Sequence, residues 1–429
     1  MKSFNFNKQS LRKYFSNTSW LIGERILRII VFVFVGAYVA RFLGPDQYGV
    51  LNYAISFVAL FSALAAAGLD SILVRELIRH VDKRDEILGT SFILRLLGSI
   101  IVFFIIALLT RFTKDDQTTN SIILIITGGL IFQSFNVLDY YFQSQVLSKN
   151  VVFAQIIQLI ISSILKLVLI FLKAPLLWFA YIILLDSVLL ASGLIFNYLR
   201  KSLSFLRWKI NWKLSLSLMK DAWPLVLSGI AISIYMKIDQ VMIKHMIGDA
   251  SVGIYAVAVR LSEVWYFIPT LICGSLFPAI LNSKKTSIDL YHRRLQELYA
   301  LMFWIAVVVA IPGTLFAVPI IKILFGAPYL ESVSVLRIYI WSSIFVFLGV
   351  ANGKYLISEN YTRIAFLRTS VGMISNVLLN LVLIKYYGII GAAIATVISY
   401  FIATFFIVFI AKTRRQAVLM LKFIDFRIP

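Results

Sequence analysis

Long apolar runs separated by short polar segments fill nearly the whole sequence. The runs are about 20 residues long, which is the length a helix needs to cross about 30 Å of hydrocarbon. Residues such as those from Ile100 to Leu109 are apolar on every face, whereas a barrel strand would alternate apolar and polar positions. We therefore predict twelve spanning helices at 19–41, 48–69, 88–110, 119–141, 151–172, 175–197, 222–245, 251–273, 298–321, 332–353, 362–384 and 389–411.

The basic residues between these runs predict the orientation of the chain. If the N-terminus lies inside, the inside segments hold 25 Lys and Arg and the outside segments hold 7. Because positive loops stay in the cytoplasm, both termini are predicted to be cytoplasmic. This topology also accounts for most of the net charge of +21, so no nucleic-acid partner is expected.

Composition supports a membrane protein without catalytic or metal chemistry. Hydrophobic residues make up 60% of the chain and charged residues only 14%, with a mean hydropathy of +0.90. The single cysteine, Cys273, excludes an internal disulfide, and no phosphate-binding loop, zinc-spaced histidine pair or nucleophile triad is present. The first apolar run lacks a cleavage site, so we expect it to be retained as a helix. We predict neither an enzyme nor a cofactor.

Two stretches match at a constant offset of 204 residues and indicate a duplication. Gly44 aligns with Gly248 and Gly49 with Gly253, each pair lying between an outgoing and a returning helix. Six helices per half give two pseudo-symmetric lobes related by an axis along the membrane normal, as in parallel-repeat transporters. The predicted parts are a cytoplasmic segment 1–18, an N-lobe 19–197, a linker 198–221, a C-lobe 222–411 and a cytoplasmic tail 412–429.

Several charges are predicted to lie inside the membrane, where each needs a partner or a water-filled cavity. Arg28 on the first helix and Arg260 on the eighth are each about 13–14 Å deep, and Arg25 is one turn below Arg28. Arginine binds phosphate oxygens in a bidentate manner, so these residues and Lys237 are candidates for an anionic substrate. The alternative is structural, because Glu24 and Arg28 form an i, i+4 pair.

Other charges suggest ion coupling or structural pairing. Lys166 and Asp186 lie at similar depths on consecutive helices, and either a salt bridge or an ion-coupling site would explain them. Lys237 and Asp239 are two residues apart, so they point to different sides of their helix and cannot pair with each other. Arg337 and Arg368 lie near helix ends and are predicted to reach the membrane interface.

The order of several short motifs resembles the Wzx-type polysaccharide flippases of the multidrug/oligosaccharidyl-lipid/polysaccharide exporter superfamily. The residues that carry this resemblance are Glu24-Arg25-Ile26-Leu27-Arg28, Arg41-Phe42-Leu43-Gly44-Pro45, Gly68-Leu69-Asp70, Lys237-Ile238-Asp239-Gln240, Leu324-Phe325-Gly326 and Tyr387-Gly388-Ile389-Ile390-Gly391. It implies a V-shaped transporter of the bacterial inner membrane that moves undecaprenyl-diphosphate-linked oligosaccharide to the outer leaflet by alternating access. It further implies H⁺ or Na⁺ as coupling ion, polysaccharide polymerase or export proteins as partners, and Arg25 or Arg28 with Arg260 as ligands of the diphosphate.

Three other functions remain open at this point. A MATE-type drug or metabolite exporter shares the superfamily, but such exporters usually bind cations with acidic cavity residues. A flippase for the peptidoglycan lipid precursor usually carries two further helices. A membrane glycosyltransferase or polymerase would need a catalytic cluster on a large outer loop, whereas the outer carboxylates Asp115 and Asp116 lie on a short one.

Overall fold

The computed structural model describes residues 8–422, and all regular structure in that range is helical. The chain divides into two compact units. The first comprises Met1–Leu43 and Ala54–Ser233, and the second comprises Gly44–Tyr53 and Ile234–Pro429. The cytoplasmic ends predicted at 1–18 and 412–429 include residues 1–7 and 423–429, which lie outside the described residues.

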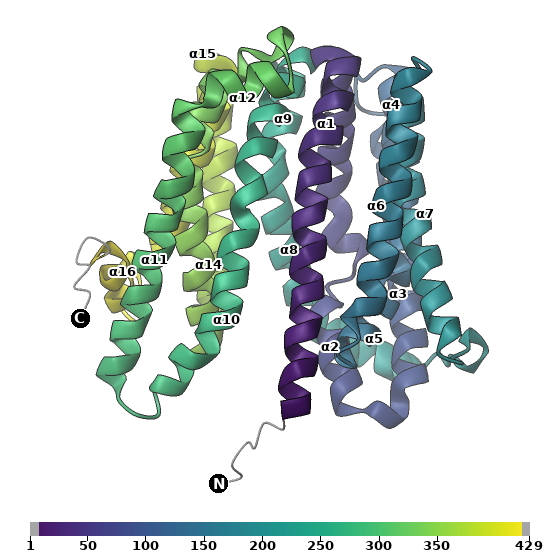
Figure 1. Ribbon diagram of the computed structural model, residues 1–429, viewed down its shortest axis with the longest axis vertical. Coiled ribbons are helices and arrows are strands. Elements are labelled where there is room, and N and C mark those ends of the chain that lie inside the picture. The colour runs from purple at the N-terminus through teal and green to yellow at the C-terminus, as the bar shows by residue number, and fades with distance from the viewer. Residues whose placement is uncertain (1–7, 423–429) are drawn as a thin grey trace. The chain divides into compact units, whose positions relative to one another are not determined.

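In the first unit, α6 packs against α7, and α4 packs against both α3 and α7 (Figure 1). The elements that begin in this unit are α1 (Lys8–Ala65), α2 (Asp70–Arg79), η1 (Val81–Lys83), α3 (Arg84–Leu109), α4 (Gln117–Phe132), η2 (Gln133–Asn136), α5 (Val137–Ser144), α6 (Ser148–Phe171), α7 (Leu176–Arg200), η3 (Phe205–Arg207) and α8 (Trp212–Met246).

In the second unit, α14 contacts α10, α11 and α15, and its buried residues contribute to a large apolar core (Figure 1). The elements that follow α8 are α9 (Asp249–Glu263), η4 (Val264–Tyr266), α10 (Phe267–Ser283), α11 (Ile288–Leu315), α12 (Ala317–Leu324), η5 (Ala327–Tyr329), α13 (Ser332–Tyr339), α14 (Ser342–Ser358), α15 (Thr362–Phe405), η6 (Phe406–Phe409) and α16 (Arg414–Leu421).

The helices that are long and apolar enough to cross a membrane can be compared with the twelve predicted spans. Ten helical segments among the described residues are long and apolar enough to span a bilayer. Two of them, Ser19–Arg79 and Thr362–Phe409, have 61 and 48 residues, about twice the length that one crossing needs. Gly44 and Gly388 have positive φ and interrupt the helical backbone inside these two segments. If each of these two segments is divided at its glycine, the ten candidate segments give twelve, the number predicted.

The two copies of the repeated glycine motif contact each other within the second unit. A Cβ atom on Gly49 would overlap the carbonyl oxygen of Asp249, and a Cβ atom on Gly253 would overlap that of Pro45. Since Pro45 and Asp249 also differ by 204 in number, the contact is reciprocal between the repeats. Gly44 and Gly248, which directly precede Pro45 and Asp249 in the sequence, both have positive φ, of 70° and 131°. The sequence repeat therefore corresponds to a repeated turn whose glycines permit backbone-to-backbone packing.

Two segments predicted as connections are partly helical. α8 begins at Trp212, ten residues before the predicted start at 222, and the Asn211 side chain accepts hydrogen bonds from the backbone N–H groups of Lys213 and Leu214. This cap explains why the helix begins within the polar sequence. The segment 70–87 likewise contains α2, whose buried Ile72, Leu73 and Leu77 form an apolar face that a search for continuous apolar runs overlooks.

Candidate functional site

Glu24 and Arg28 on α1 form an ion pair. The Arg28 Nε atom lies 2.6 Å from Glu24 Oε1, and Glu24 is only 7% exposed, so its charge depends on this arginine for compensation. Arg28 keeps about a third of its surface exposed, and Arg25 on the neighbouring face is exposed. The structural pair that the i, i+4 spacing allows is thus present, while the role of Arg25 and Arg28 in substrate binding stays a prediction.

Lys166 of α6 and Asp186 of α7 are paired across neighbouring helices. The Nζ atom lies 3.4 Å from Asp186 Oδ2, and Gln158 donates a hydrogen bond of 2.7 Å to Asp186 Oδ1. Both charged side chains are about one quarter exposed. The matching depths predicted from the sequence therefore correspond to a real contact, and its part in ion coupling stays a prediction.

A third pair in the first unit joins Arg95 of α3 to Asp70 at the start of α2. Arg95 is 5% exposed, its Nη1 atom donates a 2.6 Å hydrogen bond to Asp70, and its guanidinium lies 5.5 Å from the centre of the Tyr140 ring. Asp70 is 56% exposed, so its carboxylate is accessible at the surface while the arginine is buried. Asp70 therefore compensates a charge that the helices remove from water.

Replacing Asp70 with alanine is expected to lower the free energy of unfolding by about 1–3 kcal/mol, because a buried guanidinium then loses its acceptor. Asp221→Ala is the matched control, since Asp221 pairs with Arg75 and both are well exposed. Removing that exposed pair is expected to change the free energy by at most about 1 kcal/mol. Reversible SDS titration in mixed micelles measures both values, and equal losses would contradict this interpretation of the Arg95 pair.

In the second unit, Lys237 of α8 pairs with Glu263 of α9 at 3.3 Å. The Tyr339 hydroxyl also donates to Glu263, at 3.4 Å. Three residues before Glu263, the Nη1 atom of Arg260 donates a 2.8 Å hydrogen bond to the hydroxyl of the buried Tyr48. One face of α9 therefore holds an arginine and a carboxylate that are both engaged with neighbouring segments of the same unit.

Asp239, two residues after Lys237, lies in a separate buried network. It is 3% exposed and accepts hydrogen bonds of 2.7 Å from the Tyr255 hydroxyl and from the Asn380 amide. The Thr396 hydroxyl lies 2.5 Å from Oδ2, and Asn376 accepts from Asn380 at 3.1 Å. Lys237 and Asp239 thus take different partners, as their spacing on the helix predicted.

This network has the composition of a site for a proton or a hard cation. Asp239 has no basic partner among the described residues, and a lone carboxylate is costly to bury unless it is neutralised. The Oδ1 atom of Asn380 is also buried without a hydrogen-bond donor. Carboxylate, amide and hydroxyl oxygens are the ligands that Na⁺-like hard cations prefer, and no group of three His, Cys, Asp or Glu side chains suited to a transition metal occurs within residues 8–422.

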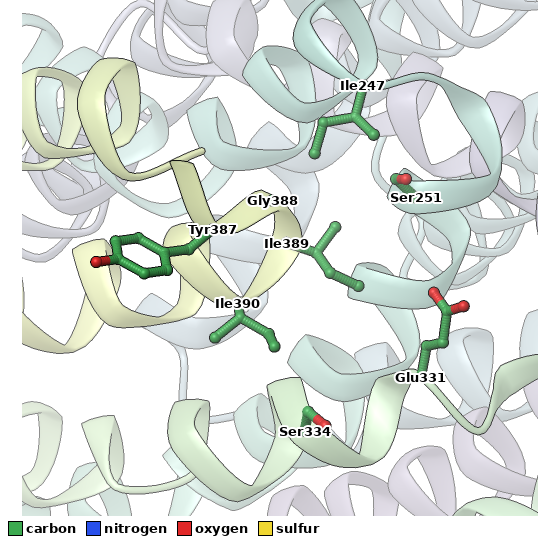
Figure 2. Close-up of a pocket in the computed structure, with 8 residues that line it drawn as sticks. All are labelled: Ile247, Ser251, Glu331, Ser334, Tyr387, Gly388, Ile389 and Ile390. Atoms are coloured by element: carbon green, nitrogen blue, oxygen red, sulfur yellow. The ribbon is translucent and has the colours of Figure 1, made fainter. Parts of the chain in front are cut away.

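A pocket of about 330 Å³ lies elsewhere in the second unit, beside the bend of α15 at Gly388. Figure 2 shows Glu331, Ser334 and Ser251 at its rim and Ile389 between them, with the Tyr387 ring pointing away from Glu331. None of the eight lining residues is a predicted site residue. Its one charged group is a carboxylate, which does not suit an anionic ligand.

Sequence reasoning found Asp239 but not the residues around it. The missed partners are Tyr255 on α9 and Asn376, Asn380 and Thr396 on α15. Asn376 and Asn380 are one helical turn apart in an otherwise apolar run, which is unusual for a membrane helix. That spacing of two buried amides was the one local indication of a polar site.

The fold is shared with solved structures of membrane proteins. A multidrug-resistance MATE transporter in an inward-facing conformation superposes with a TM-score of 0.72 at 16% identity, covering 92% of this chain and 96% of that one. The lipid II flippase MurJ gives the same TM-score at 15% identity, covering 96% and 91%. At such identities the likeness establishes only the shared fold, an all-α polytopic membrane fold, and does not distinguish a drug exporter from a flippase.

Residues 10–284 match the family described as polysaccharide biosynthesis protein, and the chain belongs to this family. The "Probable low-salt glycan biosynthesis flippase Agl15" of Haloferax volcanii is 25% identical over 52% of this chain and 49% of its own. The "Putative O-antigen transporter" of Shigella flexneri is 24% identical over 88% and 93%. Three of the curated relatives are matched over half of their length or less, namely 43%, 49% and 35%.

Proposed function

We propose that the protein is a flippase that moves polyprenyl-diphosphate-linked oligosaccharide from the inner to the outer leaflet. Membership of the polysaccharide biosynthesis family carries this proposal, because the relatives named by function are a "Probable low-salt glycan biosynthesis flippase", a "Probable flippase" and a "Putative O-antigen transporter". A bacterial substrate would be a repeat unit on undecaprenyl diphosphate, and polysaccharide polymerase or export proteins would act on it next.

The basic residues at membrane depth support an anionic headgroup as ligand. Arg25 and Arg28 in the first unit, and Arg260 and Lys237 in the second, are the groups proposed to hold the diphosphate or an acidic sugar. Guanidinium groups suit this task because they present parallel N–H donors to phosphate oxygens. In the empty site, the bond to Glu24 compensates the charge of Arg28. When substrate binds, Arg28 would exchange this bond for one to the substrate.

Ion coupling is the second part of the proposal, and Asp239 is its candidate residue. A buried carboxylate that is alternately neutralised and released by H⁺ or Na⁺ can bias one conformation of its unit over another. The hydroxyl and amide groups around Asp239 would complete the shell of a bound Na⁺. The pair of Lys166 and Asp186 is the weaker candidate, because its lysine already neutralises the carboxylate.

MATE-type export is the alternative that the fold alone would allow, since both structural likenesses have equal scores. A drug exporter would bind an amphiphilic cation, for which basic groups at membrane depth are unfavourable. Transport of a lipophilic cation such as tetraphenylphosphonium, in the absence of glycan flipping, would select this alternative.

The test uses purified protein in liposomes that contain an undecaprenyl-diphosphate-linked disaccharide. We expect Arg28→Gln combined with Arg260→Gln to slow flipping by about tenfold or more, because each variant removes a charge-assisted hydrogen bond. Arg337→Gln is the control, since Arg337 is exposed and donates to the Thr314 carbonyl oxygen. Glu24→Gln separates the structural role of Arg28 from its role in substrate binding. A loss of flipping rate equal to that caused by Arg28→Gln alone would indicate that the ion pair is structural. Undiminished flipping by the double variant would contradict the arginine clamp.

A further inference from the structure

The linker between α7 and α8 is packed against the beginning of α3, within the first unit. The backbone N–H of Lys209 donates a 3.3 Å hydrogen bond to the carbonyl oxygen of Asp85. The backbone N–H of Asn211 donates one of 3.1 Å to the Thr90 hydroxyl. A Cβ atom on Gly89 would lie 2.6 Å from the Lys209 carbonyl oxygen, so only glycine permits this close approach. The linker is therefore a packed part of the unit and not a free tether.

Every third side chain from residue 208 to residue 214 of the linker and α8 is held by the first unit. Trp208 and Leu214 pack against its apolar core, and the Trp208 indole N–H donates a 3.0 Å hydrogen bond to the Tyr198 hydroxyl. Between them, the Asn211 side chain donates a hydrogen bond to Glu86. These three positions determine which side of the segment faces the protein and which side faces away.

The exposed positions of the same segment form pairs of one apolar and one basic side chain. The pairs are Leu206 with Arg207, Lys209 with Ile210, and Trp212 with Lys213. The apolar members are 97%, 52% and 66% exposed in this order, and the three basic residues are exposed as well. Because all six residues lie outside the predicted spans, this apolar exposure marks an interaction surface and not a helix face inside the bilayer. We call residues 206–213 the linker surface.

The linker surface carries positive charge that no carboxylate neutralises. The stretch between Asp186 and Asp221 contains six Lys and Arg and no Asp or Glu. The acidic groups beside it are already engaged, since Asp221 pairs with Arg75 and Asp85 pairs with Arg84. In the described part of the chain, the three basic residues of the linker surface thus form no ion pair. The surface suits a partner that is both anionic and apolar.

The contacts of the linker place this surface at the level of the predicted membrane boundary. Tyr198, which binds Trp208, directly follows the predicted span 175–197. Gly89 and Thr90, which contact Lys209 and Asn211, are the second and third residues of the predicted span 88–110. At this level, apolar side chains can enter the boundary of the acyl chains while long basic side chains reach the headgroup phosphates.

We propose that the linker surface binds anionic phospholipid in the membrane leaflet that adjoins it. Leu206, Ile210 and Trp212 enter the acyl boundary, and the basic neighbour of each binds headgroup phosphate oxygens. Each Lys or Arg at an anionic surface strengthens binding by about fivefold, which favours an anionic lipid over a zwitterionic one. Since the linker is packed on α3, binding anchors the first unit at a defined height in the membrane. The inference does not depend on the proposed flippase function.

The first test compares phosphatidylglycerol with phosphatidylcholine in native mass spectrometry of the purified full-length protein. We expect wild type to bind phosphatidylglycerol about tenfold more tightly or better, and the triple variant Arg207→Gln, Lys209→Gln, Lys213→Gln to lose most of this preference. The three side chains are exposed and unpaired, so the variant is expected to elute as wild type does in size-exclusion chromatography. A triple variant that keeps the full preference would overturn the proposal.

The matched control replaces one Arg and two Lys elsewhere in the first unit with glutamine. These residues are exposed and follow the ends of α3 and α6, and they are Arg111, Lys114 and Lys173. Asp115 and Asp116 lie beside them in the sequence, so we expect the control to keep the lipid preference within about threefold. An equal loss in the control would mean that overall charge, and not the linker surface, selects the lipid.

The second test measures where the linker surface lies, with a spin label on Leu206→Cys in a Cys273→Ser background. In phosphatidylglycerol-containing vesicles, we expect the label to be accessible to oxygen but not to a water-soluble nickel chelate, at about 5–10 Å below the phosphates. A label that the chelate reaches would leave the surface to a soluble partner and overturn the proposal. So would binding of undecaprenyl diphosphate that depends on the three basic residues when binding of phosphatidylglycerol does not. Neither test involves flipping, so either failure leaves the proposed function standing.

Discussion

Replacing Gly253 with valine is expected to destabilise the protein more than the loss of a buried ion pair does. Any Cβ atom at this position overlaps the Pro45 carbonyl oxygen, and backbone atoms cannot move aside as a flexible side chain can. Overpacking of a tight interior costs about 3 kcal/mol or more when the neighbour is rigid. The same result is expected for Gly49→Val, because its Cβ would overlap the Asp249 carbonyl oxygen in the reciprocal contact.

Gly274→Ala is the control for this prediction. It lies inside α10 with nothing within 4 Å of an added Cβ, so alanine should be neutral or stabilise the helix by about 1 kcal/mol. The free energy of unfolding by SDS titration, together with the yield of monodisperse protein, measures all three variants. If Gly253→Val were as stable as wild type, the close contact between the repeated turns would be incorrect.

Asp239→Asn is expected to produce the largest functional loss in a protein that still folds. Asparagine has the same shape and can still accept a hydrogen bond at one oxygen from Tyr255 or Asn380. It carries no negative charge, however, so it cannot bind H⁺ or Na⁺ as the carboxylate would. Coupling free energies of this kind correspond to rate changes of about 10- to 100-fold. Flipping driven by a Na⁺ or proton gradient should fall by that factor, and its dependence on the gradient should disappear.

Asp289→Asn provides the matched comparison, since it removes the same charge from an exposed position at the beginning of α11. It should retain both the rate and the gradient dependence. Asp239→Leu tests the structural contribution of the network, because it leaves the Tyr255, Asn380 and Thr396 groups buried without their acceptor and should also lower stability. Gradient-dependent flipping by Asp239→Asn at the wild-type rate would exclude Asp239 as the coupling residue.

The features that the sequence predicted well are those set by local periodicity. Continuous apolar runs determine where the chain crosses the membrane, and the 204-residue offset predicted the related turns at Gly44 and Gly248. The Glu24–Arg28 pair follows from i, i+4 spacing, and the Lys166–Asp186 pair follows from matching depths on consecutive helices. Each of these needs only one helix or two adjacent ones.

Contacts between distant helices could not be predicted in the same way. Asp239 meets Asn380 and Thr396, which are 141 and 157 residues further along the chain, and apolar runs give no information on which face of α15 meets α8. The hydrogen bond of Arg368 to the Gly349 carbonyl oxygen could not be predicted either, because nothing in the sequence relates the two residues. Lys237 shows that even a pair on consecutive helices can be missed, because its partner Glu263 on α9 was not identified. Helix rotation and tilt depend on packing, which a single sequence leaves open.

The most direct measurement of the central claim is flipping by the wild-type protein in proteoliposomes. The liposomes contain undecaprenyl diphosphate linked to a labelled disaccharide, and a membrane-impermeant glycosidase detects the sugars that reach the outer leaflet. The proposed function predicts that the protein exposes inner-leaflet sugars much faster than empty liposomes do, without moving labelled phosphatidylglycerol or tetraphenylphosphonium. Sugar exposure at the rate of empty liposomes, with tetraphenylphosphonium transported instead, would contradict the flippase and identify an exporter of cations.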